Sequence, residues 1–369
     1  MPTTLQACAL AVAMFGTCAQ AQSNLSIYGL VDDGFLYISD VRGASQTKVF
    51  SGAANRLGFR GTEELGGGTT AFFKLESGFS LNTGAFLHGG RAFGRESYVG
   101  LGSSTLGSIS LGRQYDSVVD FLSPLSAGYR SWAGGYGAHF ADLDNMGRSL
   151  RLDNVLKYTS PTQRGWTFGG MYKFGEVAQS SANSGWGLGL SKQEGPLTLA
   201  AAYFTLDRPP AAAFDGNVNG VFRPDSPYAG LWNADQLETY GVGANYRVGR
   251  WLLGALYTHV RLKNSVLAAG DADYRNHEVS ATWDISPAWF AGAGYTFTAG
   301  EWQSSGAKPR FHQVNLGGGY NLSKRTSLYA YVIHQKASGS ARFAQQQLAG
   351  GPSSTDRQTL VQVALKHGF

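Results

Sequence analysis

The chain has 369 residues and a formal net charge of +5, and only 15% of its residues are charged while 13% are aromatic. Soluble chains of this length usually carry about 25% charged residues and divide into domains. Apolar, aromatic and glycine residues are spread evenly here with no polar linker, which indicates a single domain and argues against a multidomain soluble protein.

The first 21 residues differ from the rest of the chain. An apolar run from Leu10 to Ala19 leads into Ala19-Gln20-Ala21, a small-x-small cleavage pattern. Such a segment is too short to stay in a bilayer and predicts a cleaved secretory signal peptide at residues 1–21, although its start lacks the usual basic residue. A lipoprotein signal at Cys18 is the weaker alternative. The mature domain is then expected at residues 22–369.

Cleavage after Ala21 removes both cysteines, Cys8 and Cys18, and none of the charged residues. A mature chain without thiols excludes disulfides, thiolate metal sites and cysteine nucleophiles. Export argues against a nucleic-acid partner, so the positive charge points to anionic lipid or anionic solutes. Neither a glycine-rich phosphate loop nor a metal-ligand cluster is evident, and we expect no cofactor.

Beyond residue 21 no apolar run is long enough for a transmembrane helix. The recurring pattern has a period of two, with apolar and polar residues alternating in 239–248, 277–284 and 313–321. This alternation predicts strands with one apolar and one polar face. Aromatic residues on the apolar faces are expected in interfacial girdles: Tyr240, Tyr246, Trp283 and Tyr320.

Short turns and long polar segments alternate along the chain. Turns are predicted after Leu65, Gly102, Ser160, Gln193, Val248, Ser286 and Leu322. Long loops are predicted near 39–53, 80–91, 116–150, 177–183, 207–236, 262–272, 300–309 and 337–356. This asymmetry predicts an all-β, transmembrane, antiparallel up-and-down β-barrel of about 16 strands. Lipid offers no partner for unpaired backbone groups, so the sheet must close, and this strand number leaves an aqueous channel.

The C-terminal segment 359–369 is an amphipathic strand that ends on Phe369. One face carries valine, leucine, histidine and the terminal phenylalanine, and the other carries glutamine, alanine and lysine. A terminal aromatic strand of this kind resembles the signal that the outer-membrane barrel assembly machinery reads. Phe369 is therefore interpreted as an assembly signal.

The chain resembles the general porins of Gram-negative bacteria, in the subgroup typical of β-proteobacteria. The matching motifs are SIYGLVD at 26–32, RLGFRGTEELGGG at 56–68, FKLESGF at 73–79, RESYVGL at 95–101, LGRQYD at 111–116 and KYTSP at 157–161. The resemblance covers essentially the whole chain. It implies a homotrimer of 16-stranded barrels in the cell outer membrane, surrounded by lipid and lipopolysaccharide, each with its third external loop folded inward to narrow the pore.

Basic residues are the candidates for lining this pore. If Leu57 and Phe59 face lipid, where arginine is costly, then Arg56 and Arg60 face the lumen. The resemblance implies that Arg95 and Arg151 also project inward. Lys74 and Arg113 are further candidates, for which a merely solvated position is equally compatible with the sequence.

The third external loop, 116–150, is expected to face these cations with its acids. The candidates are Asp116, Asp120, Asp142 and Asp144, of which the first two are equally suited to bonding the base of the loop. Tyr129, Trp132 and Tyr136 either line the constriction or pack the loop against the wall. The basic wall and the +5 balance favour moderate anion preference.

Passive diffusion of ions and small hydrophilic solutes is the predicted function, without enzyme activity. A barrel enzyme is the first rival, but the seven histidines are scattered and no H-E-x-x-H or G-x-S-x-G motif is present. A substrate-specific channel, for example for sugars, is the closer alternative, and an adhesin is the third. Saturable block of conductance by a sugar would distinguish the specific channel.

Overall fold

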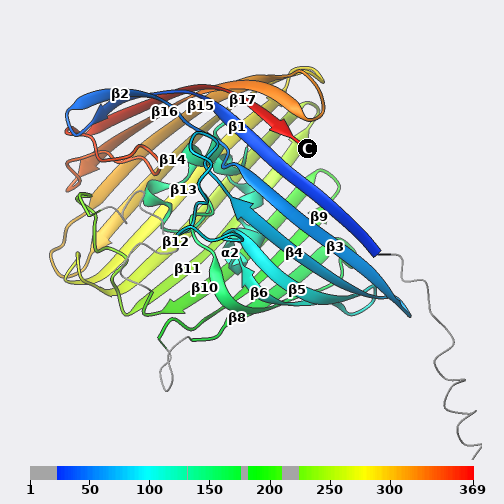
Figure 1. Cartoon of the computed structure of the whole chain (residues 1–369). Coiled ribbons are helices and arrows are strands. Elements are labelled where there is room, and N and C mark those ends of the chain that lie inside the picture. The colour runs from blue at the N-terminus through cyan, green and yellow to red at the C-terminus, as the bar shows by residue number, and fades with distance from the viewer. Residues whose placement is uncertain (1–22, 131, 176–181, 210–223) are drawn as a thin grey trace, which may run out of the picture.

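The computed structural model describes residues 23–130, 132–175, 182–209 and 224–369. Within these ranges the chain forms one antiparallel sheet that closes on itself, with the segment after β6 lying inside it (Figure 1). The predicted signal peptide, residues 1–21, lies outside the described residues. None of the helices in the described ranges is both long and apolar enough to cross a membrane.

Strands follow one another around the barrel in chain order. The first half comprises β1 (Ser23–Val41), β2 (Ala44–Val49), β3 (Arg56–Gly66), β4 (Thr69–Gly78), β5 (Glu96–Ser103), β6 (Gly107–Gln114), β7 (Leu152–Thr159) and β8 (Trp166–Lys173). The second half comprises β9 (Gly185–Glu194), β10 (Leu197–Asp207), β11 (Gln236–Val248), β12 (Trp251–Ser265), β13 (Gly270–Asp284), β14 (Trp289–Trp302), β15 (Pro309–Asn321), β16 (Thr326–Gly339) and β17 (Arg357–Gly368).

Seventeen strands fill sixteen positions in the barrel. β2 pairs with the upper part of β1, from Phe35 to Val41, and β3 pairs with its lower part, from Ser23 to Leu30. The two therefore act as one spanning strand interrupted at residues 50–55. This arrangement confirms the predicted count of about 16.

The seven predicted turns are confirmed, each joining two neighbouring strands at the same end of the barrel (Figure 1). Two predicted long loops are wrong. The segment near 39–53 turns tightly at Arg42 and Gly43, with φ of 57° and 94°, and continues as β2. The segment near 262–272 is reduced to 266–269. In both places the strands extend into polar sequence, where no apolar face marks them.

The predicted alternation of faces is confirmed on the exposed side. Val242 and Val279 are 55% and 57% exposed on the outer face, whereas Asn315 on the inner face is fully buried. The aromatic residues on the outer face stack across neighbouring strands, as between Trp251 and Trp283 with ring centroids 5.2 Å apart. A smooth apolar exterior of this kind matches the hydrocarbon region of a bilayer.

The barrel closes between β1 and β17, in register from Leu30 opposite Gly368 to Ile38 opposite Leu360. Gly29 and Phe369 extend this closure by exchanging backbone hydrogen bonds of 3.1 and 3.2 Å. A Cβ atom at Gly29 would lie 2.3 Å from the Phe369 ring, so only glycine leaves room for the terminal side chain.

The hydrophobic core lies inside the barrel, along the inner face of the later strands. Phe140 of the inward segment stacks on Phe311 of β15 at 3.7 Å between centroids and meets Tyr228 edge-on at 5.0 Å. The Tyr228 hydroxyl donates to the carbonyl of Phe343 at 2.8 Å. The segments before β11 and after β16 therefore close over the inward segment from the mouth of the barrel.

Candidate pore constriction

Loop 3, residues 115–151 between β6 and β7, occupies part of the lumen (Figure 1). It opens with α2 (Ser117–Phe121) and continues through short 3₁₀ turns at Ser123–Leu125, Ala127–Tyr129, Gly134–Gly137 and Phe140–Asp142. Asp116 caps α2 by accepting from the Val119 amide at 2.9 Å. Its second oxygen accepts from the Asn145 side chain at 2.7 Å, which ties the outgoing and returning limbs of the loop together.

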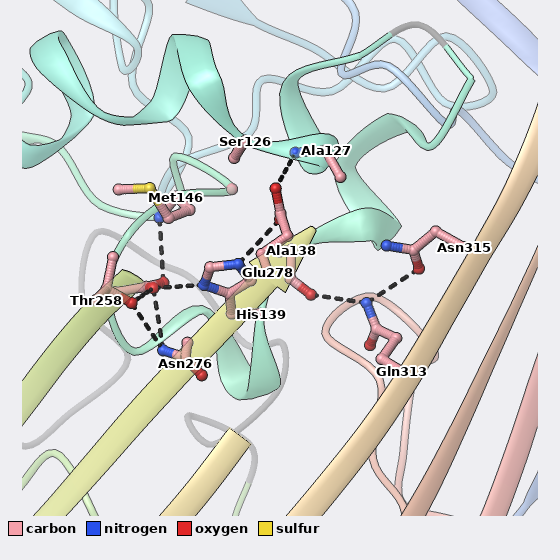
Figure 2. A network of polar contacts seen from close by, with 12 residues as sticks. Ser126, Ala127, Ala138, His139, Met146, Thr258, Asn276, Glu278, Gln313 and Asn315 are labelled. Carbon is pink, nitrogen blue, oxygen red and sulfur yellow. Dashed lines mark hydrogen bonds and ion pairs between the residues drawn. The ribbon is translucent and has the colours of Figure 1, made fainter. Parts of the chain in front are cut away.

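A buried polar cluster joins loop 3 to the barrel wall at β12 and β13 (Figure 2). Glu278 of β13 accepts from the Ala127 amide at 2.7 Å and lies 3.0 Å from Nε2 of His139. The other ring nitrogen of His139 is 2.6 Å from Asp144. Thus one wall carboxylate holds the loop at two points that are twelve residues apart.

Asp144 completes this cluster with two further wall residues. It accepts from the Thr258 hydroxyl of β12 at 2.5 Å and from the Asn276 amide of β13 at 3.1 Å (Figure 2). We call His139, Asp144, Thr258, Asn276 and Glu278 the loop 3 anchor. All five are buried, so their hydrogen bonds satisfy groups that water cannot reach.

Trp132 adds a second attachment, in a groove formed by glycines. Its indole Nε1 donates to Thr282 at 2.7 Å. A Cβ atom at Gly292 would lie 2.2 Å from the indole, and one at Gly317 would lie 2.0 Å from the Trp132 carbonyl oxygen. The absence of side chains on β14 and β15 therefore lets the loop backbone approach the wall. Trp132 and Tyr136 are buried, so these aromatics pack the loop instead of lining the pore.

Burial shifts the ionisation of the loop carboxyls. Burial, with the nearby charge of Asp144, raises the pKa of Asp142 to about 7. Burial also raises the pKa of Asp116 to about 6. For His139, burial alone would lower the pKa, but the charge of Asp144 and the hydrogen bonds to both carboxylates raise it well above its usual value.

Four arginines gather in the lumen: Arg56 and Arg95 on the barrel wall, at the start of β3 and just before β5, and Arg148 and Arg151 at the returning end of loop 3. We call these four residues the arginine wall. Arg95 is buried and binds Glu76 through Nε at 2.5 Å. Arg151 is also buried, and its Nε donates to the Tyr115 hydroxyl at 3.0 Å. These two arginines are held rigidly by their partners.

Arg56 and Arg148 are partly exposed. Arg56 lies within range of the charges of Arg95 and Arg148. The Arg148 guanidinium stacks over the ring of Tyr129 at 4.0 Å. Like charges grouped at a partly open surface produce a strong local positive potential.

The four other predicted residues have contacts of their own. Arg60 is exposed over the ring of Tyr28 at 5.3 Å. Lys74 forms ion pairs with Glu96 and Glu76, the second at 3.7 Å. Arg113 is buried, where its Nε donates to the Gly94 carbonyl at 2.8 Å, and it also pairs with Asp153. Asp120 pairs with Lys157 at 2.6 Å and is about one-third exposed.

The other acids of loop 3 do not meet the arginine wall. Asp116 and Asp142 bind amides of the loop itself, the latter at Gly147 and Ser149 over 2.6 and 3.0 Å. Asp144 belongs to the loop 3 anchor. All three are at most 2% exposed, so they hold the loop in shape and present no charge to the lumen.

The sequence interpretation missed Glu76, Tyr115, His139, Arg148 and Glu278. Glu278 stood on the polar face of its predicted strand, which signals an inward position but not a partner in loop 3. His139 and Arg148 lie in irregular sequence with no spacing that marks them. Among the described residues, no group of three histidine, cysteine or acidic side chains is placed to hold a metal ion.

The family model of Gram-negative porins matches residues 7–340. Outer membrane porin protein 32 of Delftia acidovorans is 29% identical over 98% of both chains. An outer membrane porin of Bordetella pertussis is also 29% identical, over 91% of this chain and 94% of its own. The anion-selective porin from Comamonas acidovorans superposes with a TM-score of 0.72 at 25% identity, covering 94% of this chain and all of that one. The trimer form of OmpT from Vibrio cholerae has the same fold, with a TM-score of 0.70 at 15% identity over 94% and 99% of the two chains.

Proposed function

The chain belongs to the family of Gram-negative porins, and we propose that its pore favours anions and that three copies assemble into a trimer. Its function is that of an outer-membrane channel and not of an enzyme, as for the porins it resembles across its length. The position of the ionised groups in the lumen carries the proposal of anion preference.

Loop 3 narrows the lumen without adding acids to its open surface, apart from Asp120, which is paired with Lys157. Arg56 and Arg60 of β3, together with Arg148 of loop 3, keep part of their surface in water. Low-dielectric walls amplify the field of a few such cations and raise the local concentration of anions. The anion selectivity named for the Comamonas porin supports the same sign for this chain.

The test is the reversal potential of the reconstituted protein in a salt gradient across a planar bilayer. We expect a reversal potential whose sign shows that chloride permeates more easily than the cation. In Arg56→Gln/Arg148→Gln this potential should fall toward zero. Lys324→Gln, in the short turn between β15 and β16, is the control for charge removal outside the lumen and should leave the potential unchanged. Cation preference of the unmodified protein would overturn the proposal.

The outer surface supports the trimer. Each strand from β8 to β15 carries an outward tryptophan or tyrosine at an end of its apolar stretch: Trp166, Tyr172, Trp186, Tyr203, Tyr240, Trp251, Trp283, Trp289 and Tyr320. On the sector from β16 through β17 and β1 to β6, the exposed large side chains are aliphatic or phenylalanine apart from Tyr37. Interfacial aromatics are expected where a barrel meets lipid, so their gap marks a surface that faces another protein.

Mass measurement of the detergent-extracted protein by native mass spectrometry tests the trimer. Three copies per particle are expected. Substituting Leu101→Arg, in the sector without interfacial aromatics, should yield folded monomers, whereas Val242→Arg on the aromatic sector should keep the trimer if the protein still folds. A monomeric mass for the unmodified protein would contradict the proposal.

A further inference from the structure

A hollow in the wall of the lumen lies where β1, β3, β4 and β5 run side by side (Figure 1). We call it the lumen hollow. Its volume is about 520 Å³, which is within the range of small-molecule sites, and its lining includes Ser26, Tyr28, Arg60, Thr62, Phe72 and Tyr98. Arg60 follows Arg56 by four residues on β3. At ~3.3 Å per residue and a tilt of ~40°, the hollow therefore lies ~10 Å from Arg56 toward the short turns.

The aromatic side chains of the hollow point into the lumen. Phe73 on β4 and Val99 on β5 are exposed on the outer face of the barrel. Successive side chains of a strand point to opposite faces, so the neighbouring Phe72 and Tyr98 face inward. Both are partly exposed, which places two aromatic rings at the surface of a water-filled channel.

Two of the rings lie across the next strand, over a glycine. A Cβ atom at Gly58 would lie 2.3 Å from the Tyr28 ring, and one at Gly100 would lie 2.4 Å from the Phe72 ring. The Tyr28 hydroxyl donates to Glu76 at 2.8 Å, which fixes that ring in place. The rings therefore rest on bare backbone and leave the centre of the hollow open.

Strand register brings the rings close to one cation. Phe72 and Tyr98 meet edge-on with their centroids 6.3 Å apart, and the Arg60 guanidinium lies over the Tyr28 ring at 5.3 Å. Thr62 is directly opposite Phe72, so Arg60, two residues from Thr62, is the diagonal neighbour of Phe72. Diagonal neighbours are ~7–8 Å apart, a distance that long side chains can span.

Arg60 is the cation of the hollow whose charge is available to a ligand. Lys74, directly opposite Arg60, is bonded to Glu96 and lies 3.7 Å from Glu76. Among the residues that the structure describes, no carboxylate lies in ion-pair range of Arg60, whose side chain is exposed. A guanidinium in this state can donate two parallel hydrogen bonds to a carboxylate from solution.

We propose that the lumen hollow is a subsite for aromatic carboxylates, of which benzoate is the simplest, as they diffuse through the pore. The ring of the solute packs against Phe72 and Tyr98, since paired aromatic rings attract beyond the area that they bury. Its carboxylate accepts hydrogen bonds from Arg60. The inference rests on the proposed function as a channel and adds to it a class of solute.

The experiment records the chloride current of the reconstituted protein while a solute is added in increasing concentration. Benzoate is the probe, and three relatives each lack one of its features. Acetate lacks the ring, cyclohexanecarboxylate lacks the aromatic faces, and benzamide lacks the charge. We expect benzoate to block the current saturably, with half-block at a concentration about fivefold lower than for any of the three.

Two variants test the residues. Phe72→Leu keeps an apolar side chain but removes the ring, and it should weaken the block by benzoate about fivefold. Phe73→Leu is the matched control, because it makes the same change one residue further on, at the outer face. Arg60→Gln should weaken the block about tenfold and carries the test if Phe72→Leu does not insert. Chloride steps without benzoate show that each variant has folded.

The proposal would be overturned if acetate, cyclohexanecarboxylate or benzamide blocked as well as benzoate does. An unchanged block in Phe72→Leu and Arg60→Gln, or an equal loss in Phe73→Leu, would also overturn it. The reversal potential in chloride alone tests the anion preference in the same membrane. A cation-selective pore that benzoate blocks through Phe72 would contradict the anion preference and support this site. An anion-selective pore without this block would do the reverse.

Discussion

The loop 3 anchor and the arginine wall both contain ionisable residues inside one barrel, but these residues differ in access to water. The anchor joins His139 to Asp144 and Glu278, all at most 2% exposed. The wall leaves Arg56 and Arg148 partly open. A buried ionised group stabilises only through its partners, whereas an open one acts on mobile ions. We therefore expect most of the acids of loop 3 to shape the pore and the arginines to supply its electric field.

Removing the wall carboxylate of the anchor should have the largest effect. Glu278→Ala leaves the Ala127 amide without its acceptor inside the barrel and leaves His139 with Asp144 as its one carboxylate partner. Breaking a buried charged pair from one side costs about 3–5 kcal/mol, so loop 3 should detach. We expect rapid cleavage of loop 3 by added protease and noisy, enlarged single-channel currents.

Glu301→Ala is the matched control, because Glu301 is an exposed acid of the neighbouring strand. It should retain the protease resistance and steady current of the unmodified protein. Quiet channels in Glu278→Ala would contradict the role of the anchor.

Closing the glycine groove should have the next largest effect. In Gly317→Ala the new Cβ would meet the Trp132 carbonyl oxygen at 2.0 Å, a backbone atom that cannot move alone. Overpacking of this kind costs about 1–3 kcal/mol and should push loop 3 away from β15 and further into the lumen. Smaller single-channel conductance is expected, measured against Ala293→Val on the outer face of β14. Unchanged conductance with unchanged thermal stability would show that the groove does not set the position of the loop.

The pH response should separate the anchor from the wall. The pKa of His139 is raised on folding, so its contribution is complete below about 6.5 and is lost as the pH rises through the raised value. The raised pKa of Asp142, about 7, acts in the same direction, with stability declining from about pH 4 to pH 7. The lowered pKa of Asp144 acts in the opposite direction, with stability lost as the pH falls below about 4.

We therefore expect loop 3 to be held best near pH 4 and progressively less well as the pH rises, with a slope of at most about 1.4 kcal/mol per pH unit for each proton. Protease cleavage of loop 3 should accelerate from pH 6 to pH 9. His139→Gln should flatten the upper part of this profile. If the rate of protease cleavage of the unmodified protein did not depend on pH, titration of the anchor would not control the position of loop 3. The arginines should stay charged over the whole pH range.

The strands could be predicted because each is marked by local sequence alone: apolar and polar residues alternate within it, as in 239–248, and a turn follows at its end. The inward side of Arg56 and Arg60 followed from the same local rule. The burial of Asp144 was not predictable, because it depends on Thr258 and Asn276, which lie more than a hundred residues away in sequence. At Arg113 a register shift between Gly112 and Gln114 breaks the alternation that would have fixed its side of the sheet.

Asp120 belongs to loop 3 but resembles the wall in its exposure, and its substitution should have the smallest effect. Its ion pair with Lys157 is partly open to solvent, so Asp120→Asn should change stability by less than about 1 kcal/mol. The same change leaves Lys157 without its carboxylate partner, so its positive charge acts on ions in the lumen. The reversal potential should therefore shift slightly, in the direction of stronger chloride preference. Asp142→Asn is the matched control, since its carboxyl is buried and should alter stability more than selectivity. If Asp142→Asn moved the potential more than Asp120→Asn did, then exposure would not decide which charges the permeating ions meet.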